Sequence, residues 1–138
     1  MSKPIDTRKP SKEMILKLNE LNGFRPKLVR VLEVIATTVA NKYIADEAIT
    51  TFEAKKLIEK LVNNEMKQFD DIITEAYAKR LSVSNIIDLI DFYRSEAGVK
   101  IVENHDEIQE ELRVLIEKFG VEFVYSSKNA FKNEIDNK

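Results

Sequence analysis

Residues 86–100 of the chain are Ile-Ile-Asp-Leu-Ile-Asp-Phe-Tyr-Arg-Ser-Glu-Ala-Gly-Val-Lys. Apolar side chains recur in this stretch at spacings of three and four residues, which predicts a short amphipathic helix. The repeated positions are Ile86, Leu89, Ile90 and Tyr93. Ile87 and Phe92 widen the apolar face, so we expect this helix to be packed on more than one side. Ser95 is a suitable N-terminal cap for a further helix.

The same spacing predicts helices on both sides of this stretch. The expected ranges are about 12–22, 26–46 and 51–80. Ser82 and Ser84 mark the start of the short central helix, and helical sequence continues from residue 96. Ser11 and Thr50 or Thr51 are suited to cap helix starts, and Gly23 to end the first helix. We expect the second helix to be largely buried on two sides. The third is unusually long, and Asn63-Asn64 is the point at which it would bend or break.

Beyond residue 96, one seam of residues steps by three or four positions along the chain. Its members are Gly98, Ile101, His105, Ile108, Leu112, Leu115 and Phe119. We expect the seam to face neighbouring helices. Gly98 is predicted to be structural, because a glycine on a contact face lets two helix backbones approach closely. A restart near Asn104 to Asp106 is left open, and the residues after Gly120 suggest a separate last helix.

These patterns predict an all-α protein, a single-domain irregular antiparallel helical bundle of about five to seven helices. The sequence has no alternating stretch of strand length, and only three glycines and three prolines interrupt it. Residues 1–10 contain two of those prolines among polar neighbours, so we expect a mobile N-terminal arm. Residues 11–138 are then expected to form one helical domain.

The composition limits the classes of function. With 43% apolar and 33% charged residues, the chain resembles ordinary soluble folds. A net charge of -2 argues against nucleic acid as a partner, and no apolar run is long enough to span a membrane. The absence of cysteine excludes thiolate catalysis and Cys-ligated zinc. We expect a periplasmic or secreted location if an N-terminal signal was removed, and a cytoplasmic one otherwise.

The sequence contains no recognisable catalytic set, so we predict that the protein is not an enzyme and uses no cofactor or metal. His105 is the only histidine, and the residue three positions before it is Val102, which excludes the paired Glu-x-x-His pattern of di-metal bundles. Most carboxylates are expected on outward faces. Asp88 and Asp91 are the pair nearest to the central aromatic residues.

Three residues are candidates for binding a ligand: Phe92, Tyr93 and His105. An aromatic pair on a short, crowded helix could line an apolar pocket, although such residues are more often part of the core. His105 lies on the apolar seam, where a hydrogen bond to a backbone carbonyl or a carboxylate is the alternative to a binding role.

Two functions follow from these features as hypotheses. The first is a non-enzymatic interaction or structural module, with a protein partner or a homodimer. The alternative is a carrier of a small apolar ligand such as a lipid or fatty acid, which requires a closed apolar cavity of several hundred Å³.

A group of motifs in the central stretch is similar to a known family. The motifs are Leu81-Ser82, Ile86, Leu89-Ile90, Phe92-Tyr93-Arg94-Ser95 and Gly98-Val99-Lys100. Together they resemble the signature of the bacterial domain of unknown function 2059 family, over about residues 81–112. The resemblance implies an all-helical domain, often exported to the periplasm. It implies no established activity and supplies no catalytic residues.

Overall fold

The computed structural model describes residues 5–138, and every regular element in this range is an α-helix. The helices are α1 (Lys12–Leu21), α2 (Phe24–Ala45), α3 (Thr51–Ala78), α4 (Val83–Arg94) and α5 (Glu96–Asp136). The all-α fold and the expected number of helices are confirmed. The chain divides into two compact units, residues 1–99 and 100–138. That residues 11–138 behave as one domain stays a prediction.

The helix ends follow the caps expected from the sequence. Ser11 accepts a hydrogen bond from the Met14 N–H at 3.2 Å. Thr50 begins α3 with a capping box in which the Thr50 and Glu53 side chains each accept a backbone N–H. Gly23 adopts a left-handed conformation with φ of 82° between α1 and α2, which a residue with a side chain rarely adopts.

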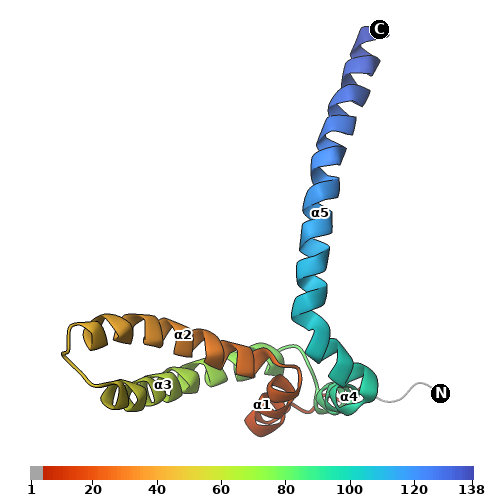
Figure 1. Ribbon diagram of the computed structural model, residues 1–138. Helices are drawn as coiled ribbons and strands as arrows, with labels where there is room; N and C mark the ends of the chain where they lie inside the picture. Colours follow the sequence, from red (N-terminus) through yellow and green to blue (C-terminus); the bar gives the residue numbers. More distant parts are fainter. Residues whose placement is uncertain (1–4) are drawn as a thin grey trace. The chain divides into compact units, whose positions relative to one another are not determined.

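The first unit is built on a long helical hairpin. Helices α2 and α3 lie side by side and run in opposite directions, with α1 packed against both of them and against α4 (Figure 1). The buried apolar core lies where α1, α3 and α4 meet. Its members are Ile15, Leu18, Ile73, Ile86 and Ile90. The side of α4 that carries Ile86 and Ile90 is therefore part of the core, as predicted. The expectation that Ile87 and Phe92 pack on a further side is wrong, because each is 45% exposed.

Two expectations for the hairpin are wrong. Helix α2 is not largely buried on two sides: Ala40 is its one buried residue, and Val34 is 65% exposed. It packs mainly against α3, so only one of its faces is covered. Helix α3 is also continuous through Asn63-Asn64. Two asparagines cost a helix only a fraction of a kcal/mol each, and the buried residues Val62 and Met66 on either side hold the helix in place.

An ion pair joins the α1–α2 corner to α3. The Arg25 guanidinium donates to both carboxylate oxygens of Asp70, at 2.8 and 2.9 Å, and to Glu20 Oε1 at 2.7 Å. Only 11% of the Asp70 side chain is exposed. The hydrogen bonds to Asp70 and then Glu20 raise the pKa of Arg25 above its usual range. The negative charge of the nearly buried Asp70 carboxylate is thus balanced by a bidentate ion pair with Arg25.

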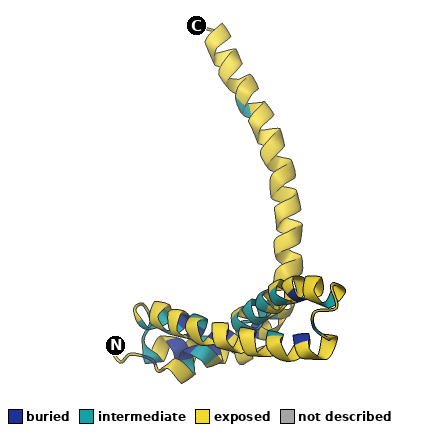
Figure 2. Cartoon of the chain, turned by 90° about the vertical axis from the view of Figure 1, so that its left-hand side faces the viewer, coloured by how far each residue is buried: buried dark blue, intermediate teal, exposed yellow. Residues whose placement is uncertain are grey.

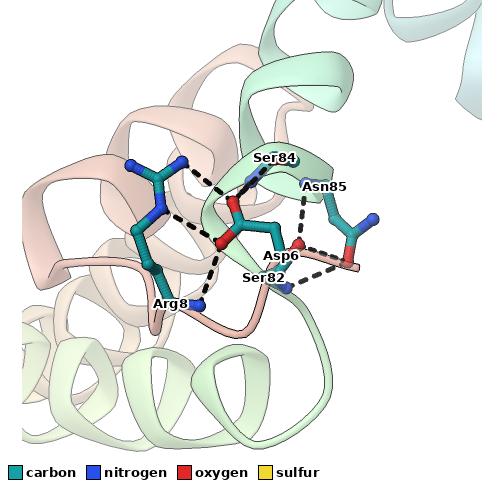
Figure 3. Close-up of polar contacts among 5 residues, drawn as sticks. All are labelled: Asp6, Arg8, Ser82, Ser84 and Asn85. Carbon is teal, nitrogen blue, oxygen red and sulfur yellow. Dashed lines mark hydrogen bonds and ion pairs between the residues drawn. The ribbon is translucent and has the colours of Figure 1, made fainter. Parts of the chain in front are cut away.

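The residues before α1 contact the start of α4 (Figure 3). The first three backbone N–H groups of α4 all have acceptors: Val83 N donates to Arg8 O at 3.1 Å, Ser84 N to Asp6 Oδ2 at 3.1 Å, and Asn85 N to Ser82 Oγ at 3.2 Å. These groups cannot be satisfied inside the helix, so the N-terminal segment supplies two of the three acceptors.

Asp6 is central to this contact. It also accepts from Ser84 Oγ at 2.6 Å and from the Arg8 guanidinium at 2.9 and 3.0 Å. The hydrogen bond from Arg8, followed by that from Ser84, holds the pKa of Asp6 well below its usual range. Of the predicted mobile arm, residues 1–4 lie outside the described residues. Pro10 is buried, and the mobility of the arm stays a prediction.

The second unit, residues 100–138, contains all of α5 except its first turn. Helix α5 runs without interruption for 41 residues. The restart that the sequence left open near Asn104 to Asp106 does not occur, and the separate last helix suggested after Gly120 is wrong. No proline occurs in α5, and a glycine inside a helix, such as Gly120, costs only about 1 kcal/mol. Arg113 further supports it by bonding Glu110 and Glu117, three residues before it and four after it.

Candidate interaction surface

Phe92 and Tyr93 lie together at the end of α4. Their rings are in edge-to-face contact, with centroids 5.1 Å apart. Tyr93 is partly buried against the core, whereas Phe92 is exposed. Asp88 and Asp91 are both exposed on the same helix. The aromatic pair therefore belongs to the edge of the core.

Gly98 lies against the end of α4. It is buried, and a Cβ atom at this position would lie 2.6 Å from Tyr93 Cα and would also clash with the Phe92 carbonyl oxygen. Ser95 shapes the turn between α4 and α5: its Oγ accepts from the Gly98 N–H at 3.2 Å and donates to the Phe92 carbonyl. The turn at Ser95 therefore brings the backbone of residue 98 so close to α4 that no room is left for a side chain there.

His105 lies in the second unit and is exposed. Of the three candidate ligand-binding residues, the structure brings Phe92 and Tyr93 into contact with one another. A ligand site that also contains His105 stays a prediction.

Two apolar hollows lie along α5. One, of about 550 Å³, is lined by residues between Phe123 and Asp136, and the other, of about 620 Å³, by residues between Asp106 and Leu115. Each is lined by a single helix and is therefore a surface groove, whereas a carrier encloses its ligand. Within residues 5–138, no group of three or more His, Cys, Asp or Glu side chains is arranged to hold a metal ion.

The main feature of the second unit is its apolar face. We define the α5 seam as Ile101, His105, Ile108, Leu112, Leu115 and Phe119. Ile108 is the least exposed of its apolar members, at 38%, and Phe119 the most exposed, at 60%. Figure 2 shows the helix almost entirely in the colour of exposed residues. A single helix cannot cover its own apolar stripe, so the seam requires a second element to pack against.

The charges of α5 are distributed unevenly around this seam. Glu110, Arg113 and Glu117 form their ion pairs on the side of the helix away from it, with bond lengths of 2.6 and 2.8 Å. The hydrogen bonds to Glu110 and then Glu117 raise the pKa of Arg113. The hydrogen bond from Arg113 lowers the pKa of Glu110. Glu111 and Lys118 instead border the seam, one residue before Leu112 and one before Phe119. The expectation that the seam faces neighbouring helices is not met within residues 100–138, where α5 is the one helix.

Part of the chain matches a known protein family. Residues 67–124 match the family model described as an uncharacterized protein conserved in bacteria, DUF2059. This confirms the resemblance seen in the sequence. The matched segment includes the end of α3, all of α4 and the whole α5 seam.

No curated protein and no solved structure was found to match the chain.

Among the helices of residues 5–138, none combines the length and the apolar character needed to cross a membrane.

Proposed function

We propose that the chain is a non-enzymatic interaction module that binds another protein through the α5 seam. The observation that carries the proposal is the seam itself: five apolar side chains at spacings that place them on one face of an uninterrupted helix. Transfer of one such side chain from water to a protein interior contributes about 1.5–3 kcal/mol. A partner that covers the seam therefore gains a large apolar contact.

The opposite side of α5 suits this role. The ion pairs of Arg113 keep charged groups on the outer face, which stays in water when the seam is covered. An amphipathic helix that inserts its apolar face into a partner is a common mode of recognition. Export to the periplasm, which the family resemblance implies, would place the partner in that compartment.

The test is the reactivity of single cysteines, which is clean because the chain has none of its own. Leu115→Cys places a thiol on the seam, and Glu103→Cys places one on the outer face as the matched control. In the monomeric chain at low concentration we expect both thiols to react with a maleimide at similar rates. Binding of a partner should slow only the seam thiol.

A contrary result is equally clear. If the seam thiol in the monomer reacts at least tenfold more slowly than the control thiol, the seam is already covered by another part of the same chain. The proposed function would then be wrong.

A further inference from the structure

We propose that the partner of the α5 seam is a second copy of the same helix, packed against it in the antiparallel direction over residues 101–126. The inference rests on the proposed function and names its partner. Three features of the second unit support it: the symmetry of the seam, the charges that border it, and its length.

The seam is nearly symmetric about a point between Arg113 and Val114. Steps of four and three residues alternate from Ile101 to Phe119, and the next steps reach Glu122 and Ser126. In an antiparallel pair centred on this point, each position faces the one at the same distance on the other side. The facing pairs are Leu112 with Leu115, Ile108 with Phe119, His105 with Glu122, and Ile101 with Ser126.

The antiparallel pairing gives a partner to Glu122, the charged residue at which the series stops being apolar. Glu122 interrupts the apolar series, and in the antiparallel pair it faces His105 of the second copy, the only other ionisable residue on the series. An imidazole and a carboxylate can form a hydrogen bond or an ion pair. The two ionisable positions therefore meet each other, Leu112 meets Leu115 and Ile108 meets Phe119, while Ile101 meets Ser126 at the end of the contact.

The bordering charges are complementary in the same arrangement. In two antiparallel helices, the residues that precede Leu112 and Phe119 lie on the same side of the contact. Glu111 of one copy then lies beside Lys118 of the other, and the twofold symmetry repeats the pair. Charges that border a helix contact are a recognised determinant of partner choice and orientation.

A parallel pair would lose both advantages. His105 would face His105 and Glu122 would face Glu122, which places two carboxylates of like charge together. Glu111 and Lys118 would lie beside Ile116 and Phe123 and find no opposite charge. The antiparallel direction is therefore the one that the side chains favour.

The contact is long enough for a stable pair of helices. Residues 101–126 rise by about 39 Å at about 1.5 Å per residue. They also contain between three and four heptads, the length at which such a pattern is typical of a coiled coil.

The first experiment measures the mass of the full chain by native mass spectrometry and sedimentation, from nanomolar to high micromolar concentration. We expect a dimer that dissociates on dilution. The variant Leu112→Glu/Leu115→Glu should weaken dimerisation by roughly 100-fold or more, because it buries charges without partners. Val114→Glu adds a charge on the side of α5 away from the seam and should change the dissociation constant by less than about threefold. Circular dichroism verifies that each variant stays helical.

The second experiment determines the direction of the helices. His105→Cys and Glu122→Cys replace polar positions and leave the apolar pairs intact. When the two single-cysteine chains are mixed and oxidised, the antiparallel pair yields mixed disulfides that join residues 105 and 122. A parallel pair yields disulfides between identical chains, which differ in mass.

A charge exchange provides an independent measure of direction. Glu111→Lys or Lys118→Glu alone should weaken the dimer by roughly fivefold, since each places like charges side by side twice. The two changes together should restore it. In a parallel pair neither change would have this effect.

The outcomes separate this inference from the proposed function. A dimer with identical-chain disulfides would overturn the antiparallel arrangement. A monomer at all concentrations whose seam thiol is accessible would overturn the dimer but leave the interaction module standing with a different partner. A monomer whose seam thiol is protected would overturn both.

Discussion

The first unit and α5 carry the same apolar repeat, but its side chains are buried in the first unit and exposed on α5. In α1 and α4, apolar residues three and four positions apart are buried against one another, and Ile15 and Ile86 are both 0% exposed. In α5 the same spacing leaves Leu112 44% exposed. The repeat specifies which face of a helix is apolar. It does not specify whether the element that covers that face belongs to the same molecule.

The difference follows from what each helix has beside it. The short helix α4 is followed by a tight turn and is held at its start by Asp6 and Arg8, so it is fixed against α1. Beyond Val99, the chain is one helix with no second element in its unit. Its apolar face is therefore available for a contact that the sequence alone cannot assign.

The largest expected effect tests whether a buried apolar residue of the first unit contributes more to the free energy of unfolding than an exposed apolar residue of α5. Ile86→Ala should lower the free energy of unfolding of the first unit by about 3–4 kcal/mol, because it leaves a cavity in a fully buried site. Leu112→Ala, the matched change on α5, should leave that free energy unchanged. The measurement is hydrogen exchange of the α1 and α4 amides.

An equal loss in the two variants would remove the distinction between the regions. It would mean that Leu112 is packed in the same cooperative unit as Ile86.

The second effect compares two arginines that each bond two acidic side chains. Arg25→Ala should cost about 3 kcal/mol, because it leaves the nearly buried Asp70 carboxylate without its counter-charge. Arg25→Lys keeps the positive charge but loses the bidentate contact, so the loss of stability should lie between zero and that of Arg25→Ala. Arg113→Ala, on the exposed face of α5, should not measurably change the unfolding of the first unit.

Urea denaturation of the three variants gives the free energies. If Arg25→Ala and Arg113→Ala proved equally harmless, the Arg25–Asp70 pair would not be a structural link between the α1–α2 corner and α3.

Much of this fold could be predicted from the sequence because its signals are local. The caps at Ser11, Thr50 and Ser82 depend on side chains within three residues of a helix start. The core position of Ile86 follows from the apolar density around it. The family resemblance likewise rests on a contiguous stretch, which the match over residues 67–124 confirms.

The features that the sequence did not predict depend on distant partners. The open face of α2 depends on which helices pack beside it. The contact between Asp6 and Ser84 joins residues 78 positions apart. In the candidate surface, the spacing identified the seam residues, but the exposure of the seam depends on how many elements surround α5.

The third effect uses the two glycines of α5, one in each unit. Gly98→Ala should lower stability by roughly 1–3 kcal/mol, because the new Cβ would overlap the backbone of Phe92 and Tyr93. Gly98→Leu should cost at least as much. Gly120→Ala should instead stabilise the helix by about 1 kcal/mol, since nothing lies within 4 Å of the added atom.

Thermal unfolding followed by circular dichroism measures both changes. A gain in stability from Gly98→Ala would show that α4 and α5 do not approach each other so closely in solution, and the contrast between the two glycines would be lost.

The smallest effect concerns the N-terminal contact that fixes α4. The pKa of Asp6 is lowered in the folded chain, chiefly by Arg8 and then by Ser84. An unfolded aspartate has a pKa of about 3.9, so both states are ionised at neutral pH and the contact contributes its full stability there. As the pH falls below about 4, the unfolded chain binds the proton first and the contribution is lost. Asp6→Asn should therefore melt below the parent chain at pH 7, and the gap should close on acidification. A gap of the same size at pH 2 would mean that the Asp6 carboxylate does not hold the start of α4 by its charge.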